Sequence, residues 1–229
     1  MGIQWQERVW SSPVLTAPSH RDPYLNCVRG SEVVNDMHKT LKAMREAGIQ
    51  PMVTLHHFTN PTWIWEQGEG TEKGWLSPEI VKLFRRFVEK TVSDLSDLCS
   101  TWCTINEPNI YAGQSYFMGI WPPGHTSPTE YFKVLYHELL AHAAAYEVIH
   151  DLQPYSKIGL AKHMIYWQPL HAGNPLDRTL SAMLDRMFNS VTLDALQTGW
   201  YKPLIGKKVE IPQLRNTLDW IGLNYYDRY

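Results

Sequence analysis

Cysteine is scarce in this 229-residue chain, which has only Cys27, Cys99 and Cys103. An odd number of cysteines, with no Cys-x-x-Cys pair among them, argues against a disulfide framework and favours reduced thiols. The first residues, Met1 to Gln4, also lack the basic start and the apolar stretch of a signal peptide. Together these absences predict a cytoplasmic protein.

Long apolar runs and an excess of one charge are also missing. No hydrophobic segment approaches the ~20 residues that a membrane-spanning helix requires. Basic and acidic residues number 21 and 23, for a net charge of -2. We therefore expect no membrane and no nucleic-acid partner. Aromatic residues, in contrast, are plentiful, with 10 Trp and 12 Tyr. Sugar-binding sites use flat aromatic faces, although core packing accounts for most of these residues.

The most informative segment is Thr104-Ile105-Asn106-Glu107-Pro108-Asn109. The residues from Thr101 to Ile105 are β-branched and aromatic, which predicts a buried strand, and Pro108 cannot continue its ladder. Glu107 is therefore expected at the carboxyl end of the strand, where the loops of α/β proteins converge on a crevice. Taken alone, a Glu at such a place is most often simply solvated.

Two further segments have the same design. Pro51 to Phe58 and Leu218 to Tyr226 are apolar along their length and end in His, Asn or Tyr. Three such strands favour a shared crevice over three separate accidents of surface chemistry.

Helical patterns separate these strands. Apolar residues at helical spacing end at Gly48 and at Gly199, a residue type that suits the left-handed position after a helix. Ser77-Pro78 and Ser127-Pro128 have the features of helix starts, and Ser127 with Glu130 has capping-box spacing. The predicted helices cover about 32–47, 78–95, 127–152 and 177–198, with another strand near 158–161. This alternation predicts an α/β fold with a parallel sheet.

The spacing of the strands sets the size of the fold. Their starts, near 52, 102, 157 and 218, lie 50, 55 and 61 residues apart. Eight such units would need on the order of 400 residues. We therefore expect a single partial-barrel domain over residues 1–229, with four clear units and the remnant of a fifth strand near Ile3 to Trp10.

The sequence resembles the family 1 glycoside hydrolases, the retaining β-glucosidases and β-galactosidases, over residues 33–229. The runs that carry the resemblance are Val53 to Pro61, Gly74 to Ser77, Trp102 to Asn109, Gly119 to Gly124 and Ile221 to Tyr226. Residues 1–30 match the family poorly. The resemblance implies strands 3 to 6 of a (β/α)8 TIM barrel.

The resemblance also implies roles for five residues. Glu107 matches the family's acid/base, and Asn106 matches the residue that hydrogen-bonds the sugar 2-hydroxyl. His57 matches a sugar contact, while Asn224 and Tyr226 match residues near the nucleophile, with the tyrosine hydroxyl holding that carboxylate. Each also has a structural interpretation: His57 and Tyr226 as buried, satisfied side chains, and Asn224 as a loop cap.

The family's nucleophile lies in a Thr-Glu-Asn-Gly stretch that this sequence does not contain. Two hypotheses follow. The chain is a β-glycosidase, with a rearranged site or with its complement supplied by another chain. Alternatively, it is an inactive truncated remnant that binds sugar weakly or serves as an assembly module. No cofactor is expected in either case.

A third hypothesis pairs Asp227 with Glu107 as the two carboxylates of an inverting glycosidase, which lie about 6.5 to 9.5 Å apart. Asp227 near a chain end is, however, usually solvated.

The segment His137-Glu138-Leu139-Leu140-Ala141-His142 looks like a zinc-protease motif but does not have its spacing. The two histidines are at i and i+5, about 140° apart on a helix, whereas that motif needs i and i+4. We therefore expect both as helix-surface or packing residues and predict no metal.

The open arc predicts self-association. Parallel sheets are normally covered on both sides, and unpaired strand edges invite pairing. We expect an inward face that includes Val53, Leu55, Ile105 and Ile221 to lack a partner, and a homo-oligomer to form through this face or the strand edges.

Overall fold

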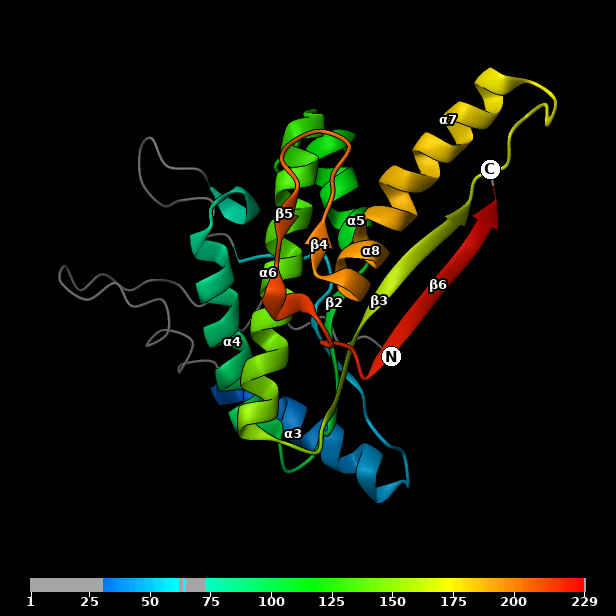
Figure 1. Ribbon diagram of the computed structural model, residues 1–229. Coiled ribbons are helices and arrows are strands. Elements are labelled where there is room, and N and C mark those ends of the chain that lie inside the picture. Colours follow the sequence, from blue (N-terminus) through cyan, green and yellow to red (C-terminus); the bar gives the residue numbers. More distant parts are fainter. Residues whose placement is uncertain (1–30, 62–63, 65–72, 229) are drawn as a thin grey trace.

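A four-stranded parallel sheet forms the centre of the computed structural model, which describes residues 31–61, 64 and 73–228 (Figure 1). The strand order is β1-β2-β3-β6, and every neighbouring pair is parallel. The strands are β1 (Val53–His56), β2 (Thr101–Asn106), β3 (Lys157–Tyr166) and β6 (Trp220–Arg228). This confirms the predicted parallel sheet. The expected strand near Ile3 to Trp10 and the poorly matching residues 1–30 lie outside the described residues.

Helices alternate with the strands, as expected. The longer ones are α3 (Ser31–Glu46), α4 (Glu79–Leu95), α6 (Pro128–Leu152), α7 (Pro175–Asp185) and α8 (Val191–Thr198). Short helical segments are η3 (Gly74–Leu76), α5 (Pro108–Ala112), η4 (Gly113–Phe117), η5 (Arg186–Ser190) and η6 (Pro212–Leu214). Within the described residues, no helix combines the length and the apolar character needed to cross a membrane.

The helix ends follow the sequence signals. The Ser127 hydroxyl accepts a hydrogen bond from the Glu130 backbone N–H at the start of α6 (3.4 Å). Gly48 and Gly199 adopt left-handed φ angles of 76° and 73° after α3 and α8. The start of α4 differs slightly: the Ser77 hydroxyl accepts from the Glu79 N–H, but the helix begins at Glu79.

Two elements differ from the sequence prediction. The helix expected over 177–198 begins at Pro175 and is interrupted by the π-helical segment η5. The strand expected near 158–161 extends to Tyr166. In addition, β4 (Trp200–Tyr201) and β5 (Val209–Glu210) form a small antiparallel pair.

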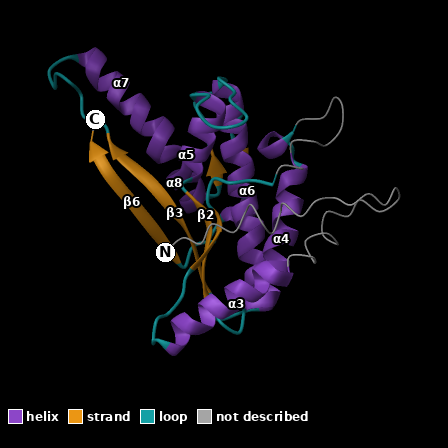
Figure 2. Cartoon of the chain, turned by 180° about the vertical axis from the view of Figure 1, so that it is seen from behind, coloured by secondary structure: helices purple, strands orange, loops and turns teal. Residues whose placement is uncertain are grey.

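The core lies between the sheet and the helices α4 and α6, which run side by side in Figures 1 and 2. Val53, Leu55 and Ile105 belong to this core and are at most 2% exposed. The expectation that these three form an open face is therefore wrong, because they pack within the helix-covered core. A short apolar strand does not reveal which of its faces the helices cover. Ile221, by contrast, is 48% exposed.

The strand β6 forms one edge of the sheet, and it projects with β3 away from α4 in Figure 2. Gly159 of β3 permits its close pairing with β6. A Cβ atom at Gly159 would lie 2.2 Å from the Trp220 carbonyl oxygen and 2.5 Å from the Trp220 ring. A side chain at this position would thus push the edge strand outward.

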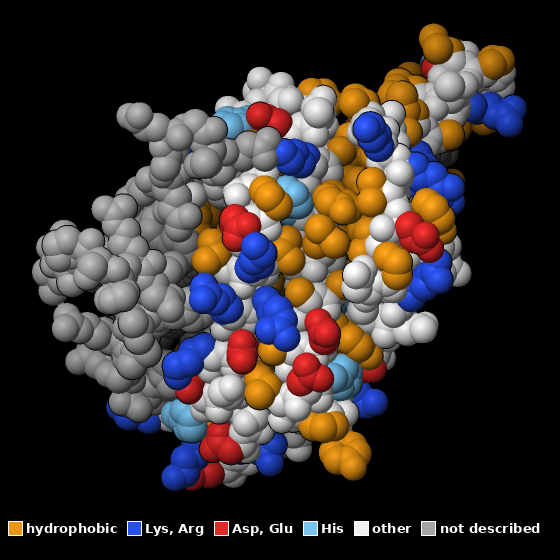
Figure 3. All heavy atoms as spheres, turned by 60° about the vertical axis from the view of Figure 1, so that its left-hand side comes forward, with side chains coloured by type: hydrophobic (Ala, Val, Ile, Leu, Met, Phe, Trp, Pro, Cys, Tyr) orange, Lys and Arg blue, Asp and Glu red, His pale blue; other side chains and the backbone are white. Residues whose placement is uncertain are grey.

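Charged side chains of both signs are interspersed on the face shown in Figure 3. On α4, for example, Lys82 pairs with Glu79 and Lys90 with Asp94. This face carries no field of one sign, unlike a surface built to bind nucleic acid.

Candidate active site

Glu107 stands where β2 ends and α5 begins. Its backbone is left-handed, with φ 49° and ψ 61°, a conformation that non-glycine residues adopt rarely and that concentrates at functional sites. The Glu107 N–H donates to the Ala161 carbonyl of β3 (2.7 Å), and its own carbonyl accepts from Ile110 and Tyr111 of α5. Hydrogen bonds to two elements therefore hold this conformation.

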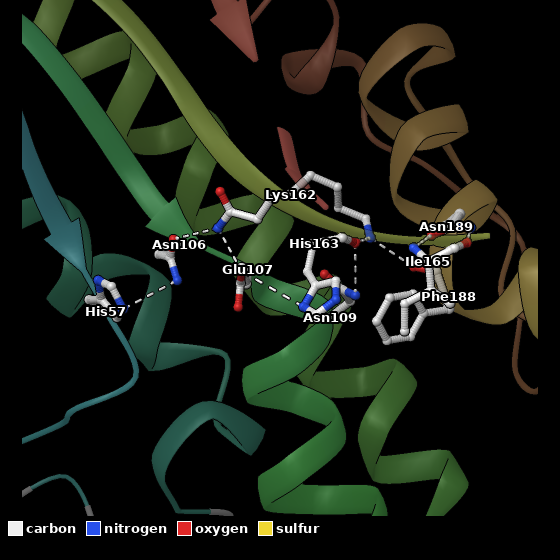
Figure 4. A network of polar contacts seen from close by, with 10 residues as sticks. His57, Asn106, Glu107, Asn109, Lys162, His163, Ile165, Phe188 and Asn189 are labelled. Carbon is white, nitrogen blue, oxygen red and sulfur yellow. Dashed lines mark hydrogen bonds and ion pairs between the residues drawn. The ribbon is translucent and has the colours of Figure 1, made fainter. Parts of the chain in front are cut away.

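The Glu107 carboxylate is buried and has a short polar contact across the sheet. Asn224 of β6 donates from its side-chain amide to Glu107 Oε1 (2.6 Å). The same amide lies 3.4 Å from the Asn106 side-chain oxygen. Figure 4 shows the Asn106 and Glu107 side chains next to each other where β2 ends. A carboxylate and two carboxamides thus converge there, with the Asn224 amide coming from the middle of β6, on the far side of β3.

His57, just after β1, extends the group on the other side. The Asn106 amide nitrogen lies 3.4 Å from His57 Nε2. Partial burial lowers the pKa of His57, and the nearby charge of Glu107 opposes this shift. The imidazole is therefore mainly neutral at pH 7, so that its ring nitrogen can accept the Asn106 N–H.

Tyr226 has a different position from the other candidates. It is 67% exposed, and its ring lies 5.1 Å from the ring of His163. The structure therefore brings His57, Asn106, Glu107 and Asn224 together. Tyr226 instead packs against His163, whose Nδ1 lies 3.8 Å from Glu107 Oε1. The structural interpretation of Tyr226 as buried is wrong, and Asn224 lies within a strand, not at a loop cap. Asp227 also lies within β6, and its side chain is outside the described part of the chain.

Lys162 and His163 are site neighbours that the sequence analysis missed. Lys162 is fully buried, and its ammonium donates to the carbonyls of His163 (2.5 Å) and Phe188 (2.9 Å). Burial lowers the pKa of Lys162 to about 7, against the raising effects of Glu107 and Asp185. In the sequence, these two ionisable residues directly follow the apolar run Ile158 to Ala161, and this pattern could have indicated them as site residues.

The two histidines of the apparent zinc motif have separate partners. His137 Nδ1 lies 2.7 Å from the Trp75 carbonyl, and His142 Nδ1 lies 2.7 Å from the Thr104 hydroxyl. Both are buried, so they are packing residues and not helix-surface residues. In the described ranges, no three His, Cys, Asp or Glu side chains converge as a metal site would require.

Comparison with known families supports what the strand ends suggest. The family model described as Glycosyl hydrolase family 1 matches residues 34–229. The chain belongs to this family. It is 31% identical over 231 residues to a coniferin beta-glucosidase of Pinus contorta, covering 86% of this chain and 42% of that protein. It is 29% identical over 205 residues to a beta-galactosidase of Sulfolobus acidocaldarius, covering 86% and 40%.

Solved structures of the family share the fold. A beta-glycosidase from Pyrococcus horikoshii matches with a TM-score of 0.74 and 31% identity, covering 98% of this chain and 47% of that one. A rice beta-glucosidase matches with a TM-score of 0.78 and 24% identity, covering 87% and 46%. The chain thus spans less than half the length of these family 1 proteins. Its four parallel strands are a partial TIM barrel, as predicted.

Proposed function

We propose that this chain carries the acid/base half of a retaining β-glycosidase site, with Glu107 as the acid/base. The observation that supports this most is the placement of Glu107: a buried carboxylate at the carboxyl end of a barrel strand, held by Asn224 and followed by α5. In this proposal Asn106 and His57 bind the sugar, and Asn224 and Tyr226 lie toward the nucleophile.

The chemistry requires a second carboxylate. In a retaining glycosidase one carboxyl group protonates the leaving oxygen and then activates water, while the other attacks the anomeric carbon from about 5 to 5.5 Å away. Among the described residues, the Glu107 carboxylate contacts the Asn224 amide and the His163 imidazole. We assign the nucleophile to a carboxylate brought by another chain or another segment. The substrate class is a terminal β-D-glucoside or β-D-galactoside, the class named in the relatives.

Hydrolysis of a chromogenic β-glucoside tests this proposal. Glu107→Gln should lower kcat/KM at least about 100-fold, the usual effect of losing a positioned proton donor. Glu89→Gln, an exposed carboxylate on α4, is the matched control and should hydrolyse at the wild-type rate. Equal rates for wild type and Glu107→Gln would reject Glu107 as the acid/base. Inversion at the anomeric carbon would replace the retaining mechanism by the pairing with Asp227.

The second candidate is a non-catalytic remnant that binds sugar weakly or serves in assembly. It is favoured by the polar group of His57, Asn106 and Asn224 next to Glu107, which has no second carboxylate in contact with it among the described side chains. In this case wild type and Glu107→Gln show the same background hydrolysis. Calorimetric titration with cellobiose would then detect weak binding that Asn106→Ala abolishes.

We also propose that the chain self-associates through β6. Among the described strands it pairs with β3 alone, and its side chains Ile221, Leu223 and Tyr225 are 48%, 65% and 53% exposed. Burying a few hundred Å² of such apolar surface favours association by several kcal/mol before entropy costs, at about 25 cal/mol per Å². Sedimentation should show a dimer that Leu223→Lys dissociates. A compact monomer at micromolar concentration, without apolar-dye binding, would contradict the proposal.

The cytoplasm is the location that we propose, because Cys99 and Cys103 are buried, free thiols that suit a reducing compartment. Cell fractionation with the thiols trapped by alkylation would test it. Recovery in a secreted fraction would reject this location.

A further inference from the structure

The backbone of His163 is fixed directly beside the candidate acid/base. His163 lies on β3, opposite Asn224 of β6. Its carbonyl accepts hydrogen bonds from the buried Lys162 ammonium (2.5 Å) and from the Asn109 amide of α5 (3.4 Å). Because α5 begins directly after Glu107, the same short helix links the positions of His163 and Glu107.

The imidazole of His163 is aimed at the Glu107 carboxylate. His163 Nδ1 lies 3.8 Å from Glu107 Oε1, and the two side chains are only 16% and 8% exposed. Figure 4 shows this contact between the labelled His163 and Glu107 side chains. Burial of both groups limits solvent screening of the electrostatic interaction between them.

Two aromatic rings flank the imidazole. Phe188 of η5 lies edge-on to it at 5.5 Å, and Tyr226 of β6 lies edge-on at 5.1 Å. The rings restrict rotation of His163 away from Glu107. Tyr226 thereby gains a contact in this chain besides the role that the family resemblance implies.

The π-helical segment η5 is attached to β3 at the level of this histidine. The Asn189 side chain accepts from the Ile165 N–H (3.3 Å) and donates to the Ile165 carbonyl (2.7 Å). Lys162 donates to the Phe188 carbonyl. Single turns of π-helix occur frequently at functional sites, since the extra residue re-aims a side chain. Here that side chain is Phe188, which contacts His163.

We propose that His163 is a positioning residue for Glu107, acting as its ionic partner and held in place by the Phe188-bearing turn η5. The assignment rests on the proposed acid/base role of Glu107. When His163 carries its second proton, it stabilises Glu107 as the carboxylate that activates water. When it is neutral, Glu107 can hold the proton that the leaving oxygen needs.

Other ionisable groups surround this pair and belong to the same electrostatic environment. The charge of Glu107 acts to raise the pKa of His57, which follows β1. The charges of Glu107 and Asp185 act to raise the pKa of Lys162. The phenol of Tyr226 lies on the β6 side. A test must therefore separate the effect of Glu107 on His163 from these other charges.

NMR titration of the histidine rings makes this separation without any activity assay. The His163 signal is assigned by its loss in His163→Gln. In Glu107→Gln, the pH at which His163 is half-protonated should fall by about one unit, since an opposite charge at this distance shifts a titration by about 1 to 3 units. The matched control is Glu130→Gln, which removes a carboxylate 2.8 Å from another histidine, His125, and should leave the His163 titration unchanged.

The result that overturns the proposal is an unchanged titration of His163 in Glu107→Gln. Phe188→Ala tests the role of η5: it should reduce the effect of Glu107 on His163 at least twofold, and an undiminished effect would reject η5 as the holding element. Failure here is distinct from failure of the proposed function. An uncoupled His163 with hydrolysis that depends on Glu107 removes only this inference, and coupling without hydrolysis removes only the glycosidase activity.

Discussion

The first and last strands of the sheet have very different surroundings. β1 and β2 lie against α4 and α6, where Leu55, Val88 and Leu139 are at most 2% exposed. At the other end, β6 has β3 as its one partner within the part of the chain that the structure describes, and Leu223 is 65% exposed. The candidate site joins both ends, since Glu107 follows β2 and Asn224 lies in β6. The helix-covered end supplies the acid, and the edge supplies the group that hydrogen-bonds it.

Truncating a core side chain should have the largest effect on stability. Leu139→Ala removes a fully buried side chain from α6 and should lower the free energy of unfolding by about 3 kcal/mol through lost burial and a new cavity. Leu223→Ala at the exposed edge should change it by less than about 0.5 kcal/mol. Urea denaturation measures both. Equal losses would mean that the edge is as well packed as the core.

A side chain at Gly159 should affect the edge selectively. Gly159→Ala places a Cβ 2.2 Å from the Trp220 carbonyl oxygen, and we expect a loss of about 2 kcal/mol from this overpacking. The control is Gly173→Ala, where a Cβ meets no atom within 4 Å. Hydrogen exchange should show faster exchange in β6 and unchanged protection in α6. Loss of protection in both would contradict a separable edge.

A buried acid in the covered half should make stability depend on pH. Glu138 is fully buried, and burial raises its pKa well above the ordinary value of 4.5. Tyr111, Tyr116, Tyr131 and Tyr201 face it, and its charge would raise their pKa values further. Neither Glu138 carboxyl oxygen has a hydrogen-bond partner among the described residues. The folded state therefore keeps Glu138 protonated at pH values where the unfolded chain ionises it.

The sign follows from this difference. The unfolded chain releases the Glu138 proton above about pH 4.5, so the folded state loses stability as pH rises from there to the folded pKa. Glu138→Gln removes this pH dependence. Relative to the wild type, the free energy of unfolding of the variant should increase by up to about 1.4 kcal/mol per pH unit between pH 5 and 7. Denaturation curves at both pH values measure the gain, and parallel pH profiles of the two proteins would refute it.

The position of Glu107 was readable from the sequence because local chemistry determines it. β-Branched and aromatic residues form β2, and Pro108 ends its ladder, so the acid follows the strand. Helix caps such as Ser127 were readable for the same reason. Family resemblance then predicted that His57, Asn106 and Asn224 would share the site.

Features fixed by contacts between distant segments were not readable. The break in the helix over 175–198 depends on the bonds of Asn189 and Lys162 with β3 and Phe188. The same contacts let β3 continue through Lys162 and His163, which look like the end of a strand when read alone. Whether the side chains of Val53, Leu55 and Ile105 are covered depends on where the helices pack, which a short apolar run does not reveal.

The strand order has a consequence for how the protein is made. Because β1, β2, β3 and β6 are neighbours in the same order as in the chain, each strand leaves the ribosome beside one that is already available for pairing. Synthesis at about 5 to 20 residues per second gives each strand and helix unit several seconds to settle before the next arrives. The described sheet can therefore grow in one direction, and β6, which brings Asn224 to Glu107, is added after β1, β2 and β3.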